Sequence, residues 1–167
     1  MLDLRPVNDG PSGGSWTIVL PLTVLRAILN EAACSDMALE TGGILLGHDD
    51  GTAATTCLTQ AGGPGPLAVR GPRYFLRDLD HAQGLAEESW QRDGSQWVGE
   101  WHTHPLGIPV PSQLDAHSYL THVRDPDLGF QRFVSLILAW NARGEWAAGA
   151  WVVDAVRTQE AELRVVE

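Results

Sequence analysis

Lysine is absent from the sequence, and only two of its 167 residues are cysteines. Cys34 and Cys57 are too few for a disulfide framework and too far apart for a CxxC metal motif. We therefore expect them to be two small buried thiols in a reducing compartment. All eleven basic residues are arginines, and we attach no mechanism to the absence of lysine.

Positive charge is also scarce, because 11 arginines face 21 aspartates and glutamates, for a formal net charge of −10 at pH 7. No basic stripe is available to neutralise phosphate groups, so the composition argues against a nucleic acid or an anionic membrane as a partner. An acidic surface remains compatible with a basic protein partner, and it is equally an ordinary means of keeping a protein in solution.

Long apolar runs are missing as well, since no stretch approaches the ~20 apolar residues that a membrane-spanning helix requires. The opening, MLDLRPVNDGPSGGSW, lacks the basic and apolar regions of a secretory signal, so we expect a cytoplasmic protein. The hydrophobic fraction of 44% and the seven tryptophans indicate an ordered chain. We expect a mobile N-terminal segment over residues 1–14 and one globular domain over residues 15–167.

The spacing of apolar residues predicts an alternation of strands and helices. We expect strands at 16–21, 41–48, 52–60, 96–102, 132–140, 146–155 and 161–167, and helices at 21–34, 77–94 and 111–123. Leu79, Ala82, Leu85 and Ala86 should face inward on the second helix. Residues 61–72 are rich in glycine and proline and predict an irregular loop. Interleaved strands and helices, without repeats or a linker, predict a single α/β domain with a mixed sheet.

The strand expected at 96–102 ends at His102, and His104 follows two residues later. Side chains alternate along a strand, so both rings project to the same side and can bind one divalent ion. Asp115 lies in the first turn of the next helix, and the stiff proline-rich loop between them could bring it back as a third ligand. A catalytic zinc site needs three protein ligands and an open position for water. An isolated HxH also occurs at surfaces and in cores, but H-x-H-P-x6-S-x-x-D is far more restrictive.

Two glutamates are candidates for a general base beside this site. Glu100 shares strand parity with both histidines, whereas Glu40 stands before a glycine-rich strand and, on pattern alone, also suits a solvated junction. Ser112 suits the N-cap of the following helix, and no Gly-x-Ser-x-Gly elbow marks it as a nucleophile. Among the remaining histidines, we expect His117 to come nearest to the ligands.

The segments HTHPLGIPVPSQLD and ETGGILLG together resemble the JAMM, or MPN-plus, zinc metallopeptidases. The segment GEWHTHP is most similar to the compact bacterial members of the prokaryotic JAB type, a deubiquitinase-like branch. The resemblance implies a single MPN domain, a cytidine-deaminase-like fold with a mixed sheet flanked by helices. It also implies a zinc-dependent isopeptidase or peptidase that cleaves after the C-terminus of a ubiquitin-like protein, in deconjugation or precursor processing. Some bacterial members act in antiphage conjugation systems, including CBASS.

The resemblance further implies a role for each site residue. His102, His104 and Asp115 would hold Zn²⁺, whose charge lowers the pKa of water from ~15.7 towards ~7. Glu40 would take the proton of that water and pass it to the leaving amine, while Ser112 would donate to the developing oxyanion. Because water is the nucleophile, no covalent intermediate is expected.

The expected partner is a ubiquitin-like protein or its conjugate, with its C-terminal tail in an active-site groove, together with the conjugation enzymes. Two alternatives stay open. One keeps the chemistry but acts on a sulfur-carrier protein that ends in an added residue. The other is an MPN-like scaffold that binds partners without catalysis, although such scaffolds usually lack the metal ligands that this chain retains.

Overall fold

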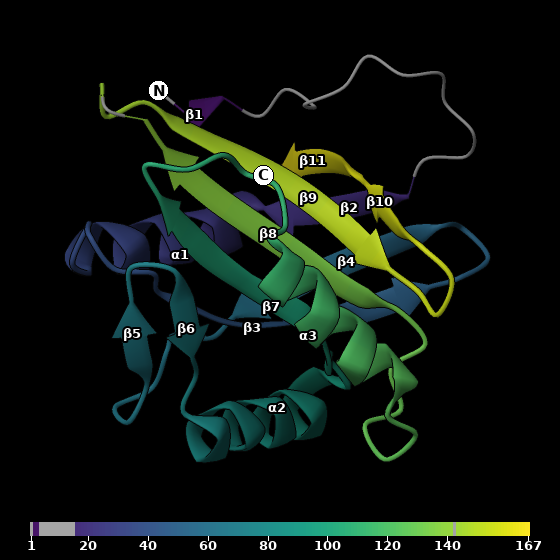
Figure 1. Ribbon diagram of the computed structural model, residues 1–167. Helices are drawn as coiled ribbons and strands as arrows, with labels where there is room; N and C mark the ends of the chain where they lie inside the picture. Colours follow the sequence, from purple (N-terminus) through teal and green to yellow (C-terminus); the bar gives the residue numbers. More distant parts are fainter. Residues whose placement is uncertain (1, 4–15, 142) are drawn as a thin grey trace.

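A mixed β-sheet forms the centre of the molecule (Figure 1). The computed structural model describes residues 2–3, 16–141 and 143–167, and nine strands of this part of the chain share one sheet. These strands are β1 (Leu2–Asp3), β2 (Thr17–Pro21), β3 (Gly42–Asp50), β4 (Thr55–Ala61), β7 (Gln96–Pro105), β8 (Phe133–Trp140), β9 (Trp146–Val153), β10 (Thr158–Glu160) and β11 (Glu162–Val166). A separate hairpin consists of β5 (Val69–Gly71) and β6 (Tyr74–Leu76).

The strands lie in the order β1-β9-β8-β7-β3-β4-β2-β11, with β10 antiparallel to β9. Strand β7 occupies the middle, parallel to β8 and antiparallel to β3. Both neighbours therefore fix its backbone, and beyond an irregularity opposite Leu45 and Leu46 the side chains from Gly99 onward alternate between the two faces of the sheet. Any side chain that β7 carries near its end is consequently placed by the most constrained part of the sheet.

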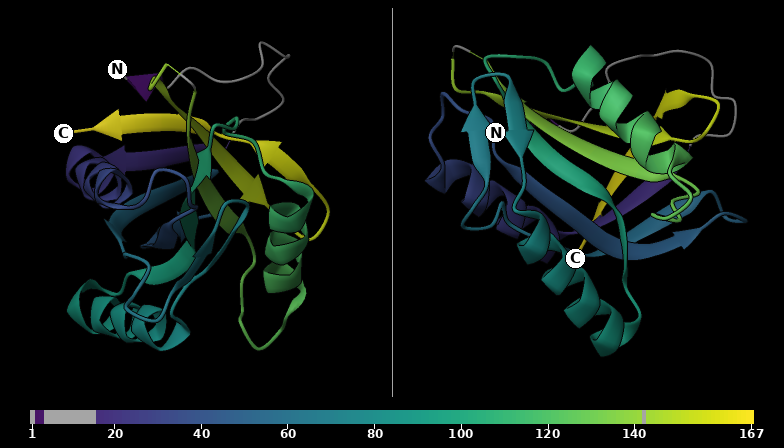
Figure 2. Two further views of the ribbon diagram at one scale, coloured as in Figure 1. Left: turned by 60° about the vertical axis from the view of Figure 1, so that its left-hand side comes forward. Right: turned by 60° about the horizontal axis from the view of Figure 1, so that its bottom comes forward.

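Three helices of the described part of the chain flank the sheet (Figure 2). They are α1 (Leu22–Cys34), α2 (Leu79–Asp93) and α3 (Gln113–Arg124). Helix α1 covers one face, where it packs on β2 and β4, whereas α2 packs on β3 and β7 and α3 packs on β8 and β9. Helix α2 begins after Asp78, whose side chain accepts a hydrogen bond from the backbone of His81, and ends at Gly94 in the left-handed conformation.

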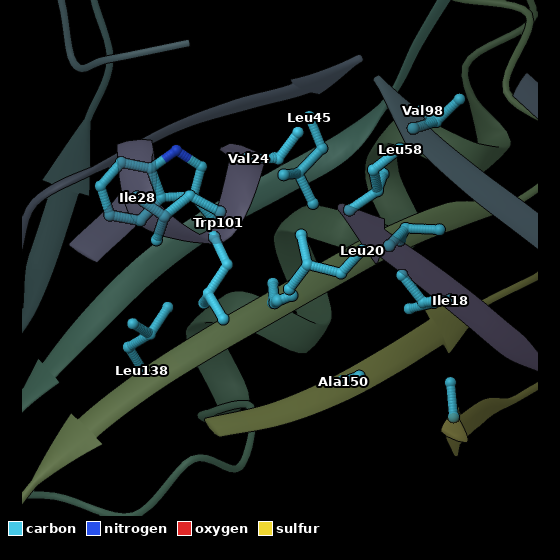
Figure 3. Packing of buried hydrophobic residues seen from close by; sticks show 14 of the residues in the cluster. Ile18, Leu20, Val24, Ile28, Leu45, Leu58, Val98, Trp101, Leu138 and Ala150 are labelled. Atoms are coloured by element: carbon cyan, nitrogen blue, oxygen red, sulfur yellow. The ribbon is translucent and has the colours of Figure 1, made fainter. Parts of the chain in front are cut away.

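The main hydrophobic core lies between α1 and the sheet (Figure 3). Figure 3 shows Val24 and Ile28 of this helix beside Leu45 and Trp101 of the sheet, and Trp101 is 1% exposed. The odd-numbered residues near the end of β7 thus face α1. The even-numbered residues face the opposite side, which α2 and α3 cover, and this side carries the candidate site.

Most of the expected elements are present, and the fold class is confirmed as α/β with a mixed sheet and flanking helices. The region 61–72 is not wholly irregular, because it includes β5, and neither β6 nor β10 was expected. Leu79 was wrongly placed inward, since it is 53% exposed in the first turn of α2. The expected mobile segment 1–14 falls, apart from the two residues of β1, outside the described residues.

The prediction of buried thiols is wrong, since both cysteines are exposed. Cys57 alternates with the buried residues Thr56 and Leu58 on β4 and so faces outward. Cys34 is the last residue of α1 and lies two positions beyond the buried Ala32. Among the described residues, no helix combines the length and hydropathy needed to span a bilayer.

Candidate metal centre

Strand β7 presents His102 and His104 on the face of the sheet that α2 and α3 cover. His102 is 2% exposed, and its Nε2 atom lies 3.0 Å from Nε2 of His104. The residues between and before them, Thr103 and Trp101, are buried on the other face, as the strand alternation predicts. Both imidazoles therefore direct the same ring nitrogen towards one point.

The first turn of α3 supplies the third group, Asp115. The backbone N–H of Ser112 donates to Oδ2 of Asp115 at 2.7 Å, and the backbone N–H of Asp115 donates to Oγ of Ser112 at 3.2 Å. This reciprocal pair is a capping box that starts the helix. The N-cap expected at Ser112 is thus confirmed, and the cap also fixes the rotamer of Asp115.

The three side chains form a compact donor set. Oδ1 of Asp115 lies 3.6 Å from Nε2 of His102, and Oδ2 lies 3.4 Å from Nε2 of His104. One ligand atom from each residue can be chosen so that all lie within 4.8 Å of one another. Two imidazole nitrogens and one carboxylate oxygen are donors that zinc accepts, and three protein ligands leave one position open. The residues present therefore fit a catalytic zinc ion.

The loop between the histidines and α3 is held from two directions. The Nδ1 atom of His104 hydrogen-bonds the backbone oxygen of Ile108 at 3.0 Å, which leaves Nε2 free to face Asp115. On the far side, the indole N–H of Trp151 in β9 donates to the backbone oxygen of Pro109 at 3.0 Å. Gly149 allows this approach, because a Cβ there would lie 2.1 Å from the same oxygen.

Burial and hydrogen bonding set the charges of the donor groups. Burial lowers the pKa of His102, despite an opposing effect of Asp115, so this ring is neutral and its lone pair is available. Burial acts to raise the pKa of Asp115, but hydrogen bonds with both histidines outweigh it and hold the pKa well below its usual range. Burial also opposes protonation of His104, yet Asp115 and the Ile108 carbonyl raise its pKa. An anionic carboxylate beside a neutral imidazole suits a divalent cation.

Glu40 reaches the same site from the segment just before β3. Gly42 lies opposite His102 in the antiparallel ladder, and the backbone N–H of Thr103 donates to the oxygen of Thr41 at 2.8 Å. Continuing this register places Glu40 opposite His104, on the same face of the sheet. Gly42 permits the close approach of β3 to β7, because a Cβ at this position would lie 2.8 Å from Cβ of His102. Burial raises the pKa of Glu40 to about 7, with His104 lowering it and Asp115 raising it.

Glu100, the other candidate base, is occupied elsewhere. Its carboxylate forms an ion pair with Arg77, and its Oε1 atom lies 3.6 Å from Nδ1 of His102. It thus lies behind the histidine, on the side away from Asp115. His117, the remaining histidine expected nearest to the ligands, is exposed on α3.

Two residues near the site were not anticipated. Tyr119 is fully buried, one turn beyond Asp115 on α3, and accepts a hydrogen bond from Ser135 at 2.8 Å. The spacing of four residues on a helix could have indicated it. Arg77 precedes α2 and reaches the site only through the tertiary fold, so no local pattern indicates it.

The sheet, its flanking helices and the donor set define a JAB-type domain, and comparison of sequences supports this class. Residues 22–154 match the family of prokaryotic homologues of the JAB domain, and the chain belongs to that family.

Three curated relatives of the chain carry the name CD-NTase/cGAS isopeptidase. One from Enterobacter hormaechei is 27% identical over 151 residues, which cover 90% of this chain and 83% of the relative. Another from Vibrio cholerae is 29% identical over 108 residues, which cover 64% of this chain and 68% of the relative. A solution structure of a Desulfitobacterium hafniense protein has the same fold, with a TM-score of 0.68, 20% identity, and coverage of 90% of this chain and 93% of that one.

Proposed function

We propose that the protein is a zinc-dependent isopeptidase or peptidase that hydrolyses the bond after the C-terminus of a ubiquitin-like protein. The observation that carries the proposal is the convergence of His102, His104 and Asp115 at the buried end of β7, with Glu40 opposite. Nothing in ordinary packing requires two imidazoles, a carboxylate and a second, partly desolvated carboxyl to face one another.

The residues of this chain divide the reaction between them. When bound by the three ligands, zinc supplies the positive charge that makes water a nucleophile near neutral pH. Glu40, with a pKa raised to about 7, accepts the proton of the attacking water and delivers it to the departing amine. Oγ of Ser112 accepts from the backbone of Asp115, so its hydrogen can donate to the oxyanion of the tetrahedral intermediate.

The expected substrate follows from the relatives and from the surface near the site. The relatives are named isopeptidases of CD-NTases, so we infer a CD-NTase conjugate in a CBASS-type antiphage system, and a cytoplasmic location. Exposed apolar side chains occur on the β5–β6 hairpin and on the loop between His104 and α3: Val69, Tyr74, Leu76, Leu106 and Ile108. The backbone oxygen of Gly71 in this hairpin accepts from the N–H of Glu40, which ties the hairpin to the site. We propose that a C-terminal tail binds between these apolar groups.

A cleavage panel tests this function. The protein is incubated with ubiquitin-like fusions, sulfur-carrier fusions ending in an added residue, and a conjugated CD-NTase, with and without a strong chelator. Cleavage of the ubiquitin-like or conjugated substrates should require metal and be lost in His102→Ala and Asp115→Ala. The exposed His81→Ala variant is the matched control and should retain it. Glu40→Gln should bind zinc yet cleave ~10²–10⁴-fold more slowly, as expected for loss of a general base.

Each alternative has its own outcome in this panel. Cleavage confined to the sulfur-carrier fusions would replace the substrate class while keeping the chemistry. A protein that binds the substrates without cleaving any of them, and that takes up no zinc, would be a scaffold and would refute the proposal.

A further inference from the structure

His102 is buried with one ring nitrogen unexplained. Its Nε2 atom faces Asp115 and the second imidazole, whereas its Nδ1 atom has less than 1 Å² of exposed surface and no hydrogen-bond partner among the described residues. A neutral imidazole that donates its Nε2 lone pair to a cation must carry its proton on Nδ1. That proton then needs a buried acceptor.

The acceptor in place is the carboxylate of Glu100. Oε1 of Glu100 lies 3.6 Å from Nδ1 of His102, so an approach of about 0.6 Å would bring the two atoms within hydrogen-bond range. The other oxygen, Oε2, is held by Arg77. The guanidinium carbon of Arg77 in turn lies 5.5 Å from the ring centroid of Trp97. The two oxygens of one buried carboxylate are therefore assigned to two different neighbours.

We propose that Glu100, held by Arg77, is a positioning residue for the metal ligand His102. The carboxylate fixes the tautomer with hydrogen on Nδ1 and keeps the ring plane aligned with the position of the cation. His104 is oriented differently, by the neutral backbone carbonyl of Ile108. The inference rests on the proposed zinc centre, and it assigns to Glu100 a role distinct from that of the base Glu40.

Glu100→Gln gives a sharp test, because Arg77 can only donate hydrogen bonds. The amide oxygen of the glutamine should turn to Arg77, which leaves the NH₂ group facing Nδ1 and favours the wrong tautomer of His102. We expect the zinc affinity of the metal-stripped variant, measured by competition with a chromophoric chelator, to fall ~10–100-fold.

The double variant Arg77→Met/Glu100→Gln separates positioning from mere stability. Without Arg77, the glutamine oxygen is free to turn to His102, so the double variant should bind zinc more tightly than Glu100→Gln alone. It also buries no unpaired charge, so it should fold even if the single variant does not. Zinc affinity of both variants within about two-fold of the parent would overturn the inference, and so would a double variant no better than a folded single variant.

The matched control is the ion pair between Asp49 and Arg132, at a site remote from the ligands. Oδ2 of Asp49 lies 2.7 Å from Nη2 of Arg132. Asp49→Asn should lower stability and leave zinc affinity unchanged. In the zinc-loaded parent, the Nδ1 proton of His102 should resonate downfield, as a hydrogen bond to a carboxylate requires; the position of a weakly bonded imidazole proton would contradict the inference. If the parent binds zinc and the Glu100 variants bind it equally well, only the positioning role of Glu100 is refuted. If the parent binds no zinc, the proposed function is refuted and this role with it.

Discussion

Glu40 occupies a position that does not favour an ionised carboxyl. Glu40 is only 8% exposed. Burial is the largest cause of the rise in its pKa from an ordinary 4.5 to about 7. A general base that works near neutral pH benefits from such a pKa, because it can both take and return a proton. In the metal-free protein the same desolvation lowers the stability of the fold.

The sign of this effect predicts a dependence on pH. Between about 4.5 and 7 the folded chain keeps a proton on Glu40 that the unfolded chain has lost, so stability falls as pH rises through this window. Glu40→Gln cannot ionise and escapes the loss. Relative to the parent, the metal-free variant should gain about 3 kcal/mol in unfolding free energy between pH 4 and pH 8. Urea unfolding at both pH values measures this gain.

The exposed Glu87→Gln variant serves as the control and should follow the parent at both pH values. An equal response of the parent and Glu40→Gln to pH would show that Glu40 is not desolvated in the fold.

Sequence reasoning reached some residues of the site and not others, for a physical reason. His102 and His104 could be placed on one face because strand alternation is local and strict. Glu40 and Glu100 could not be ranked from pattern alone, because their difference lies in what packs against each. The buried thiols were wrongly predicted, since average burial of a residue type says nothing of strand parity at a single position.

At the scale of elements, α3 starts with a group that serves two purposes. Oγ of Ser112 accepts the N–H of Asp115 in the capping box, and its hydrogen can donate to a substrate oxygen. Replacing the serine by alanine removes both functions together, so loss of activity in that variant would not identify its cause.

Glycine separates the two functions of Ser112. As an N-cap, glycine costs only a few tenths of a kcal/mol relative to serine, but it has no hydroxyl. Ser112→Gly should therefore unfold within ~0.5 kcal/mol of the parent, while kcat falls ~10²–10³-fold through loss of an oxyanion donor. Ser112→Thr keeps the hydroxyl and should retain most activity. A kcat for Ser112→Gly close to that of the parent would leave Ser112 with a capping role alone.

The elements missed from the sequence are short and depend on distant partners. Strands β5, β6 and β10 each have three residues, too few for alternation to be recognised. The longer strands carry several apolar alternations, and the three helices of the described residues carry apolar periodicity over more than one turn. These elements were predicted close to their observed positions. The length of an element, rather than its importance for the site, decided which could be found.

At the scale of the whole molecule, the ligands join segments that are separate in the fold. His102 and His104 belong to the central sheet, while Asp115 belongs to a helix that packs on β8 and β9. A cation bound by all three would therefore connect the sheet to the helical layer, and binding to the folded state alone would stabilise the entire domain.

Removal of metal should consequently lower thermal stability. At free zinc 100-fold above the dissociation constant, one site adds ~2.7 kcal/mol, or roughly 5–10 °C in Tm for a chain of this size. Calorimetry of the metal-stripped protein with and without added zinc measures the shift. Asp115→Ala should show little of it and His81→Ala should show all of it. A shift that persists in Asp115→Ala would place the stabilising ion elsewhere.

The indole of Trp151, which holds Pro109 from a strand remote in sequence, bears on how a cation enters. Because the segment from the second imidazole to the carboxylate is already restrained, capture of an ion removes little conformational entropy. We expect association to be limited by release of water from the incoming ion rather than by a search of the chain for its closed form.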